Sequence, residues 1–207
     1  MKKYGLLKPE AFQSLRWSLF CGEPLPQDYV TLWQAAAPNS KVENIYGPTE
    51  TTIAITAYSW QPGVSDKYCH NGIVPVGFPL EGQAAAVVDE KLRFVPPGIE
   101  GELCLSGSQV SPGYWSNEPQ TAKSFVTLSD SRRWYRTGDR VRFTEESGYL
   151  FLGRIDRQIK IRGFRAEIPE IEHTLRQVIT RGLVAVIGWP VGASGADGVI
   201  AFTDAKE

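Results

Sequence analysis

Glycine and proline interrupt this chain at short intervals, and their placement restricts what it can fold into. The 207 residues include 20 glycines and 14 prolines, more than a globular protein of this length usually carries. They gather in clusters between brief apolar runs, for example at Pro96-Pro97-Gly98. Because such clusters end a strand or helix after a few residues, the pattern predicts many short strands joined by turns and excludes a helical bundle.

The composition excludes several classes of protein. Hydrophobic residues make up 42% and charged residues 22% of the chain, which is ordinary for a folded domain and excludes wholesale disorder. No apolar run approaches the ~18 residues that span a bilayer, and the N-terminal residues lack the apolar core of a signal peptide. The formal net charge of −1 gives no overall attraction to nucleic acid or anionic lipid. We therefore expect a cytoplasmic protein that binds neither nucleic acid nor a membrane.

Cysteine and histidine show no pattern typical of a disulfide framework or a metal site. Cys21, Cys69 and Cys104 are far apart, odd in number and without a CxxC pair. His70 and His173 lack the HxxE or HExxH spacing of metal ligands. We interpret both histidines as ordinary surface or loop residues.

The first two regions of the chain differ in their hydrophobic pattern. In residues 1–71, an apolar run at 17–20 precedes helical spacing over 27–36 and a second apolar run at 42–46. Strand, helix and strand in this order are typical of a layered α/β unit. In residues 72–155, brief β-type runs alternate with turn signals, which predicts a small, barrel-like β-rich subdomain.

Residues 156–207 form the third region. Polar and apolar residues alternate over 158–162, as in a strand with one buried face. A helix is predicted from Pro169, because proline suits the first helical position, and strands are predicted over 183–187 and 199–202. The chain is therefore predicted to have a mixed α/β fold: an α/β layer, a β-rich subdomain and the opening of a small α+β domain.

Basic residues concentrate at the junction of the second and third regions. Residues 154–165 contain five basic side chains against a single acidic one, Asp156. Such a run usually forms a solvated strand face. The alternative is that it faces an anion, although binding of bulk nucleic acid is not expected without a basic balance over the whole chain.

The segment Asn44–Glu50, NIYGPTE, is the first with evident chemical potential. Its Gly-Pro pair permits a sharp turn, Tyr46 offers an aromatic face, Thr49 offers a hydroxyl, and Glu50 offers a hard oxygen ligand suited to Mg²⁺. The alternative is a turn that leads into a helix, with Thr49 as its N-cap and Glu50 in the first turn.

Two later motifs are each ambiguous alone. Asp139 ends Tyr135–Asp139, YRTGD, where an aspartate in a turn usually satisfies backbone N–H groups. Its functional use is a carboxylate that accepts two ribose hydroxyls, as in dinucleotide-binding folds. Arg154 opens Gly153–Gly163 and could bind a phosphate with two parallel hydrogen bonds.

Taken in order, the motifs resemble the successive signatures of the adenylate-forming enzyme superfamily. They are Asn44–Glu50 (NIYGPTE), Gly101–Tyr114 (GELCLSGSQVSPGY), Tyr135–Asp139 (YRTGD) and Gly153–Glu172 (GRIDRQIKIRGFRAEIPEIE). The chain is most similar to amino-acid adenylation domains of nonribosomal peptide synthetases and to D-alanine–carrier protein ligases. The resemblance extends from about Leu15 to Phe202.

This resemblance implies an ATP-dependent, AMP-forming ligase that uses Mg²⁺. Such an enzyme activates an amino acid as an acyl-adenylate, releases pyrophosphate and transfers the acyl group to the phosphopantetheine thiol of a carrier protein. The alternatives are an acyl-CoA ligase of the same superfamily, or a non-catalytic module that binds a nucleotide or docks a carrier protein.

The resemblance also implies roles for individual residues. Nucleotide binding is implied for Gly22, Glu23, Asn44, Tyr46, Gly47, Thr49, Asp139, Phe151 and Arg154. Tyr46 would stack on adenine, Thr49 would bond the α-phosphate, and Asp139 would accept both ribose hydroxyls. Catalytic roles are implied for Thr49, for Glu50 as the Mg²⁺ ligand, and for Lys160.

Further roles concern domain motion and the acyl group. Asp156 matches the superfamily's hinge, and Gly163 would let a pantetheine arm pass closely. The walls of the acyl pocket would include Ser18, Phe20, Ile45, Ile53 and Ala54. These small or apolar residues favour an uncharged substrate side chain, although aliphatic residues are equally typical of any buried strand face.

Two superfamily motifs have no counterpart in the sequence: the glycine-rich phosphate loop with its following lysine, and the late Asn-Gly-Lys motif. We therefore expect the chain to be the back half of a large domain plus the opening of a small one. We expect it to show negligible pyrophosphate exchange by itself.

Overall fold

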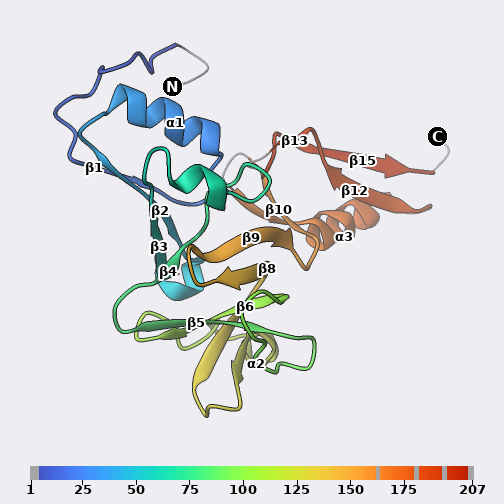
Figure 1. Ribbon diagram of the computed structural model, residues 1–207. Coiled ribbons are helices and arrows are strands. Elements are labelled where there is room, and N and C mark those ends of the chain that lie inside the picture. Colours follow the sequence, from blue (N-terminus) through green and yellow to red (C-terminus); the bar gives the residue numbers. More distant parts are fainter. Residues whose placement is uncertain (1–4, 162–163, 180–181, 193–194, 205–207) are drawn as a thin grey trace. The chain divides into compact units, whose positions relative to one another are not determined.

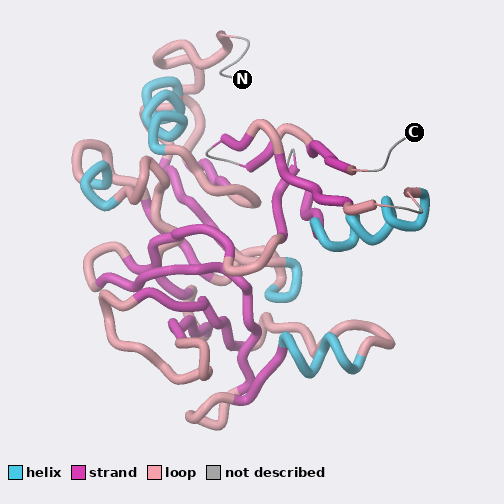
Figure 2. The backbone as a smooth tube through the Cα atoms, turned by 90° about the vertical axis from the view of Figure 1, so that its right-hand side faces the viewer, coloured by secondary structure: helices cyan, strands magenta, loops and turns pink. Residues whose placement is uncertain are grey.

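The protein, seen here as a computed structural model, consists of two compact units, residues 1–153 and 154–207 (Figure 1). The structure describes residues 5–161, 164–179, 182–192 and 195–204. Strands account for most of the regular structure (Figure 2), as the turn-rich sequence predicts. In the described part of the chain, no helix is long and apolar enough to cross a membrane.

The first unit begins with a four-stranded sheet of order β1-β2-β3-β4. Its strands are β1 (Trp17–Phe20), β2 (Lys41–Tyr46), β3 (Thr56–Ser59) and β4 (Phe78–Pro79). β1 and β2 are parallel and are connected through helix α1 (Gln27–Ala36), whereas the later pairs are antiparallel. Val30 of α1 and Val42 of β2 belong to one buried cluster, so the helix packs on this sheet. β4 joins the sheet although it lies beyond residue 71, where the sequence pattern changes.

A second sheet of the first unit has the order β5-β6-β8-β7, with β9 paired to β8. Its strands are β5 (Gln83–Val88), β6 (Glu100–Gly107), β7 (Phe125–Thr127), β8 (Arg133–Thr144) and β9 (Gly148–Arg154). Helix α2 (Glu118–Ser124) precedes β7 and has no buried residue. It therefore carries no apolar stripe from which the sequence could predict it.

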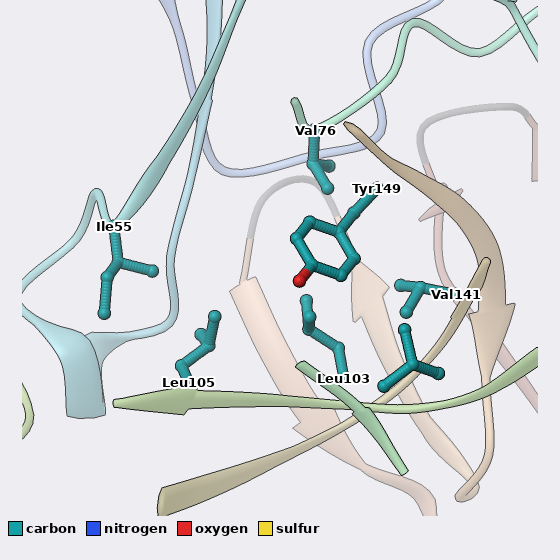
Figure 3. Close-up of a cluster of buried hydrophobic side chains, with 7 residues drawn as sticks. Ile55, Val76, Leu103, Leu105, Val141 and Tyr149 are labelled. Carbon is teal, nitrogen blue, oxygen red and sulfur yellow. The ribbon is translucent and has the colours of Figure 1, made fainter. Parts of the chain in front are cut away.

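A hydrophobic cluster joins the two sheets (Figure 3). The members of this cluster are Ile55, Val76, Val87, Leu103, Leu105, Val141 and Tyr149. The Tyr149 ring lies among Val76, Leu103 and Val141 (Figure 3), and its hydroxyl donates to the Ala85 carbonyl at 2.5 Å. Burial raises the pKa of Tyr149 to about 12, because the phenolate would lose its hydration in this core.

The two sheets also meet through the backbone at Gly77. Its carbonyl accepts the Tyr149 N–H at 2.9 Å, and the Val76 N–H donates to the Tyr149 carbonyl at 2.9 Å. A Cβ on Gly77, whose φ is +77°, would stand 1.9 Å from the Ala57 carbonyl oxygen. Only a residue without a side chain allows β3, β9 and the Gly77 segment to approach this closely.

The second unit contains two small sheets and one helix. One sheet has the order β11-β10-β14-β13, and the other pairs β12 with β15. The elements are β10 (Gln158–Ile161), β11 (Phe164–Glu167), α3 (Ile168–Val178), β12 (Val184–Gly188), β13 (Val191–Gly192), β14 (Gly195–Ala196) and β15 (Val199–Thr203). Ile168 of α3 packs against Val184 and Val186 of β12 in a buried cluster.

Glu172 of α3 is the buried polar centre of the second unit. Its carboxylate accepts two hydrogen bonds from Arg157, at 2.7 and 3.0 Å, and one from the Val186 N–H at 3.0 Å. Arg176 lies 3.4 Å away on the next turn. These donors, Arg157 first, lower the pKa of Glu172 to about 2, so the carboxylate fastens α3 to β12 while it is ionised.

The close approach at Gly77 predicts a large loss of stability in Gly77→Ala. The variant combines an unfavourable positive φ with a clash against backbone, which together cost about 3 kcal/mol or more. Gly63→Ala is the matched control, because Gly63 has a similar φ of +72° but nothing within 4 Å of an added Cβ; it should cost about 1 kcal/mol. Urea unfolding measures the loss of unfolding free energy in both variants, and equal losses would contradict the steric argument.

Glu172 predicts a pH-dependent contribution to stability. Its folded pKa is depressed from 4.5 to about 2, so its stabilising effect is fully present above about pH 4.5 and is lost as the pH falls through 2. Wild type should therefore exceed Glu172→Gln in unfolding free energy at pH 6, and the difference should shrink between pH 4.5 and 2. Glu170→Gln, which removes an exposed carboxylate from the same helix, is the matched control, and its difference from wild type in unfolding free energy should be much smaller. A difference independent of pH would refute the account.

Candidate nucleotide site

Tyr46 and Asp139 meet although 93 residues separate them. Tyr46 is the last residue of β2 and Asp139 lies in β8; the tyrosine hydroxyl donates to Asp139 Oδ2. Asp139 is 7% exposed. The first unit therefore brings the Asn44–Glu50 and Tyr135–Asp139 motifs together at one place.

Asp139 lies within a strand, and the expectation of a turn at Thr137-Gly138-Asp139 is wrong. β8 runs through this segment, and its pairing with β6 shifts register between Glu102 and Cys104. Gly138 has a φ of +70°, and the Thr137 hydroxyl accepts the Asp139 N–H at 3.0 Å. The segment is thus a β-bulge inside the strand, and it has two features that are common in turns, a glycine with positive φ and a hydroxyl that accepts a nearby backbone N–H.

Glu102 of β6 holds this bulge from the neighbouring strand. Its Oε1 accepts the Gly138 N–H at 3.0 Å, and its Oε2 accepts two donors of Arg136 at 2.7 and 3.0 Å. The Thr137 hydroxyl donates to the Leu103 carbonyl at 2.8 Å. The backbone that presents Asp139 is therefore fixed by side chains on both sides, and no pattern in the sequence predicts this pairing of Glu102 with Gly138.

Thr49 and Glu50 lie in a single 3-10 turn, η2 (Thr49–Thr51), directly after β2. The alternative of Thr49 as an N-cap is wrong, because Pro48 holds the cap position and no side chain bonds there. Thr49 is exposed, whereas Glu50 is only 9% exposed.

Two groups from the Gly101–Tyr114 motif hold Glu50. Tyr114 donates its hydroxyl to Glu50 Oε1 at 2.6 Å, and the Ser111 N–H donates to the Glu50 carbonyl at 2.8 Å. Burial, and after it the bond to Glu50, raises the pKa of Tyr114. Sequence reasoning did not single out either residue, because their importance follows from a contact across more than sixty positions of chain.

The segment after η2 is strained. Thr52 and Ile53 both have positive φ, at 58° and 74°, which is unfavourable for β-branched residues. Gln109 stabilises the segment from the facing loop: its carbonyl accepts the Thr52 hydroxyl at 2.8 Å, and its Nε2 donates to the Ala54 carbonyl at 2.9 Å. Backbone strain that neighbours hold in place is common beside functional sites.

Gly22 and Glu23 follow Cys21, whose Sγ donates to the Ile53 carbonyl at 3.7 Å. The segment expected to flank adenine therefore lies against the strained turn. Asn44 is buried and donates to the carbonyls of Val74 and Pro75, at 3.3 and 2.9 Å. Gly47 packs within the same turn, because an added Cβ would stand 2.8 Å from the Ile53 carbonyl oxygen.

The five expected acyl-pocket residues do not share one wall. Ser18 bonds Ser40 at 2.7 Å and accepts the Trp33 indole N–H at 2.8 Å, and Phe20 meets the same Trp33 edge-on. These two side chains therefore face α1, whereas Ile45, adjacent to the buried Asn44 in β2, lies on the other face of the sheet. Ile53 is 64% exposed beyond β2, next to Ala54. Their common role in substrate binding stays a prediction.

The expected groups of the second unit form their own contacts. Arg154 donates two hydrogen bonds to Asp156, at 2.5 and 2.9 Å, and Arg157 is bound to Glu172. Acidic side chains therefore neutralise part of the basic run. Lys160 lies in β10, opposite Arg165 of β11. Phe151 of β9 belongs to the first unit and packs at the edge of its core. Gly163 lies outside the described residues.

The side chains near Glu50 are compatible with a Mg²⁺ ion that is also bound by phosphate. Within the described ranges, no three histidine, cysteine or acidic side chains gather into a group that could hold a metal ion. Glu50 would therefore supply a single carboxylate beside the exposed Thr49. Mg²⁺ is usually bound by one or two carboxylates together with substrate phosphates rather than by an all-protein cage, so Glu50 is compatible with Mg²⁺ that arrives with a nucleotide.

Comparison with known proteins identifies the family to which this chain belongs. Residues 2–115, more than half of the chain, match the family described as AMP-binding enzyme. The chain belongs to that family, and the resemblance drawn from its motifs is confirmed.

Individual relatives agree with this family. A linear gramicidin synthase protein of Brevibacillus parabrevis is 40% identical over 165 residues, which cover 79% of this chain and 3% of that protein. D-alanine–D-alanyl carrier protein ligase of Lacticaseibacillus casei is 38% identical over 167 residues, which cover 81% of this chain and 32% of that protein. The chain therefore spans about a third or less of the length of these curated relatives.

Solved structures confirm the mixed α/β fold. The Vibrio cholerae adenylation domain AlmE, in complex with glycyl-adenosine-5'-phosphate, matches 99% of this chain and 39% of its own, with a TM-score of 0.87 and 35% identity. A nonribosomal peptide synthetase protein with adenylation and PCP domains matches 95% of this chain and 39% of its own, with a TM-score of 0.79 and 28% identity.

Proposed function

We propose that this chain is the AMP-binding part of an ATP-dependent ligase that activates an amino acid and passes it to a carrier protein. The observation that carries the proposal is the contact between Tyr46 and Asp139, which joins two motifs expected to hold one nucleotide. The carrier-protein ligase and the adenylation–PCP protein among its relatives support the choice of substrate and acceptor.

Tyr46 and Asp139 would bind the nucleoside. The tyrosine ring would stack on the adenine, and the buried carboxylate would accept the two ribose hydroxyls. An ionised carboxylate offers about four acceptor positions, so Asp139 can keep the Tyr46 hydroxyl bond while it accepts hydroxyls from a ribose. The bulge at Gly138 fixes the direction in which this carboxylate points.

Thr49 and Glu50 would serve the phosphate end. In the first half-reaction, a carboxylate oxygen of the amino acid attacks the α-phosphorus of ATP, and the bond to the departing pyrophosphate breaks. The exposed Thr49 hydroxyl would donate to the α-phosphate. Glu50 would hold Mg²⁺, which when bound neutralises phosphate charge and so lowers the repulsion that opposes the attack.

The second half-reaction would use the product of the first. A phosphopantetheine thiolate attacks the carbonyl carbon of the acyl-adenylate, a thioester forms, and the bond to AMP breaks. The division of the chain after Gly153 lies two residues before Asp156, the residue expected at the hinge. Rotation of a small domain about such a point allows one site to serve two steps.

The amino acid is proposed to be small or uncharged. AlmE, which matches nearly the whole of this chain, was solved with a glycyl adenylate, and the Lacticaseibacillus relative is a D-alanine ligase. The side chains expected to contact the substrate, such as Ile45 and Ala54, carry no charge.

The role of Asp139 predicts discrimination between two nucleotides that differ only in the ribose. Wild type should bind AMP about ten-fold more tightly than 2',3'-dideoxy-AMP, because a hydrogen bond to a charged group contributes about 1.5–3 kcal/mol. Asp139→Asn should remove most of this preference, whereas Asp130→Asn, at an aspartate outside the site, should retain it. Calorimetric titration of the three proteins with each of the two nucleotides measures the effect. Equal affinity of the wild type for both nucleotides would refute the assignment.

A further inference from the structure

Tyr114 contacts the proposed metal ligand directly. Its hydroxyl donates to Glu50 Oε1 at 2.6 Å, while the Ser111 N–H holds the Glu50 backbone carbonyl at 2.8 Å. The segment that contains both residues is bound to β8 in turn, since Arg133 donates to the carbonyls of Ser111 and Pro112, both at 2.7 Å. Glu50 is therefore held at its side chain and its backbone by one anchored segment.

The Tyr114 ring is also held by groups other than Glu50. Its backbone N–H donates to the Thr121 hydroxyl at 2.9 Å, and its ring packs edge-on against Phe125, with centroids 5.6 Å apart. A fixed donor that faces a carboxylate restricts the orientations that the carboxylate can adopt.

We propose that Tyr114 is a positioning residue for Glu50, and that its hydroxyl holds the carboxylate in the orientation that binds Mg²⁺ together with a nucleotide triphosphate. This inference rests on the proposed function. The hydrogen bond occupies one acceptor position of the carboxylate, and an ionised carboxylate retains further positions for a metal. Loss of the hydroxyl leaves the charge in place but removes its fixed direction, so binding with the metal weakens and binding without it does not.

The test measures how strongly Mg²⁺ and nucleotide help each other to bind. The affinity of the 207-residue chain for ATP is titrated in Mg²⁺ and in EDTA, and the ratio gives the coupling factor. Tyr114→Phe should reduce this coupling factor about ten-fold, the order expected for a lost hydrogen bond to a charged group. If the wild-type coupling factor is less than ten, the factor of the variant should fall to one. Its affinity for AMP in EDTA should stay unchanged.

Tyr149→Phe is the matched control. It also loses a part-buried tyrosine hydroxyl bond, to the Ala85 carbonyl, but Tyr149 lies in the core cluster, so the variant should leave the coupling factor as in wild type. A coupling factor unchanged in Tyr114→Phe would overturn the inference. Equal weakening of ATP and AMP binding in that variant would also overturn it, because a purely structural role acts on both.

The same titrations separate this inference from the proposed function. A wild-type chain that binds AMP but shows no effect of Mg²⁺ on ATP binding would overturn the role of Tyr114 and leave nucleotide binding intact. A wild-type chain that does not bind AMP would overturn the proposed function itself, and the inference with it.

Discussion

The close backbone contact at Gly77 is the constraint on which the first unit depends. Two sheets with different topologies meet there, and the hydrogen bonds of Val76 and Gly77 with Tyr149 join the first sheet to β9, the neighbour of β8. Tyr46 and Asp139 lie on these two different sheets and contact each other. The absence of a side chain at Gly77 therefore permits the close approach of the two sheets that carry these distant motifs.

Around the contact at Gly77, the candidate site contains supporting side chains that position its other residues. Glu102 fixes the bulge that presents Asp139, Gln109 stabilises the strained turn at Thr52, and Tyr114 restrains Glu50. The supporting residues come from β6 and the loop that follows it, whereas the groups they hold come from other parts of the chain. Preorganisation of this kind reduces the cost of orienting charged groups when a ligand binds.

The sequence predicts the parts of this structure that depend on local chemistry. The strand at 17–20 and the helix over 27–36 follow from apolar spacing, and the helix near Pro169 follows from a proline suited to its first turn. Four motifs in order identify the family. Features that depend on residues far apart in the chain cannot be predicted from the sequence. The turn expected at Asp139 became a bulge because Glu102, on another strand, satisfies the Gly138 N–H. Likewise, the pairing of β1 with β2 places Ser18 and Ile45 on opposite faces of one sheet, and no local pattern predicts that pairing.

The central claim is that the Asn44–Glu50 turn and the bulge of β8 form one nucleotide site. Amide NMR spectra of the ¹⁵N-labelled chain, titrated with AMP, test this directly. The account predicts that signals of residues 46–51 and 137–140 shift together and fit a single dissociation constant, while those of 63–68, at η3 (Ser65–Tyr68), do not move. Shifts confined to one of the two segments, or two separate dissociation constants, would contradict it.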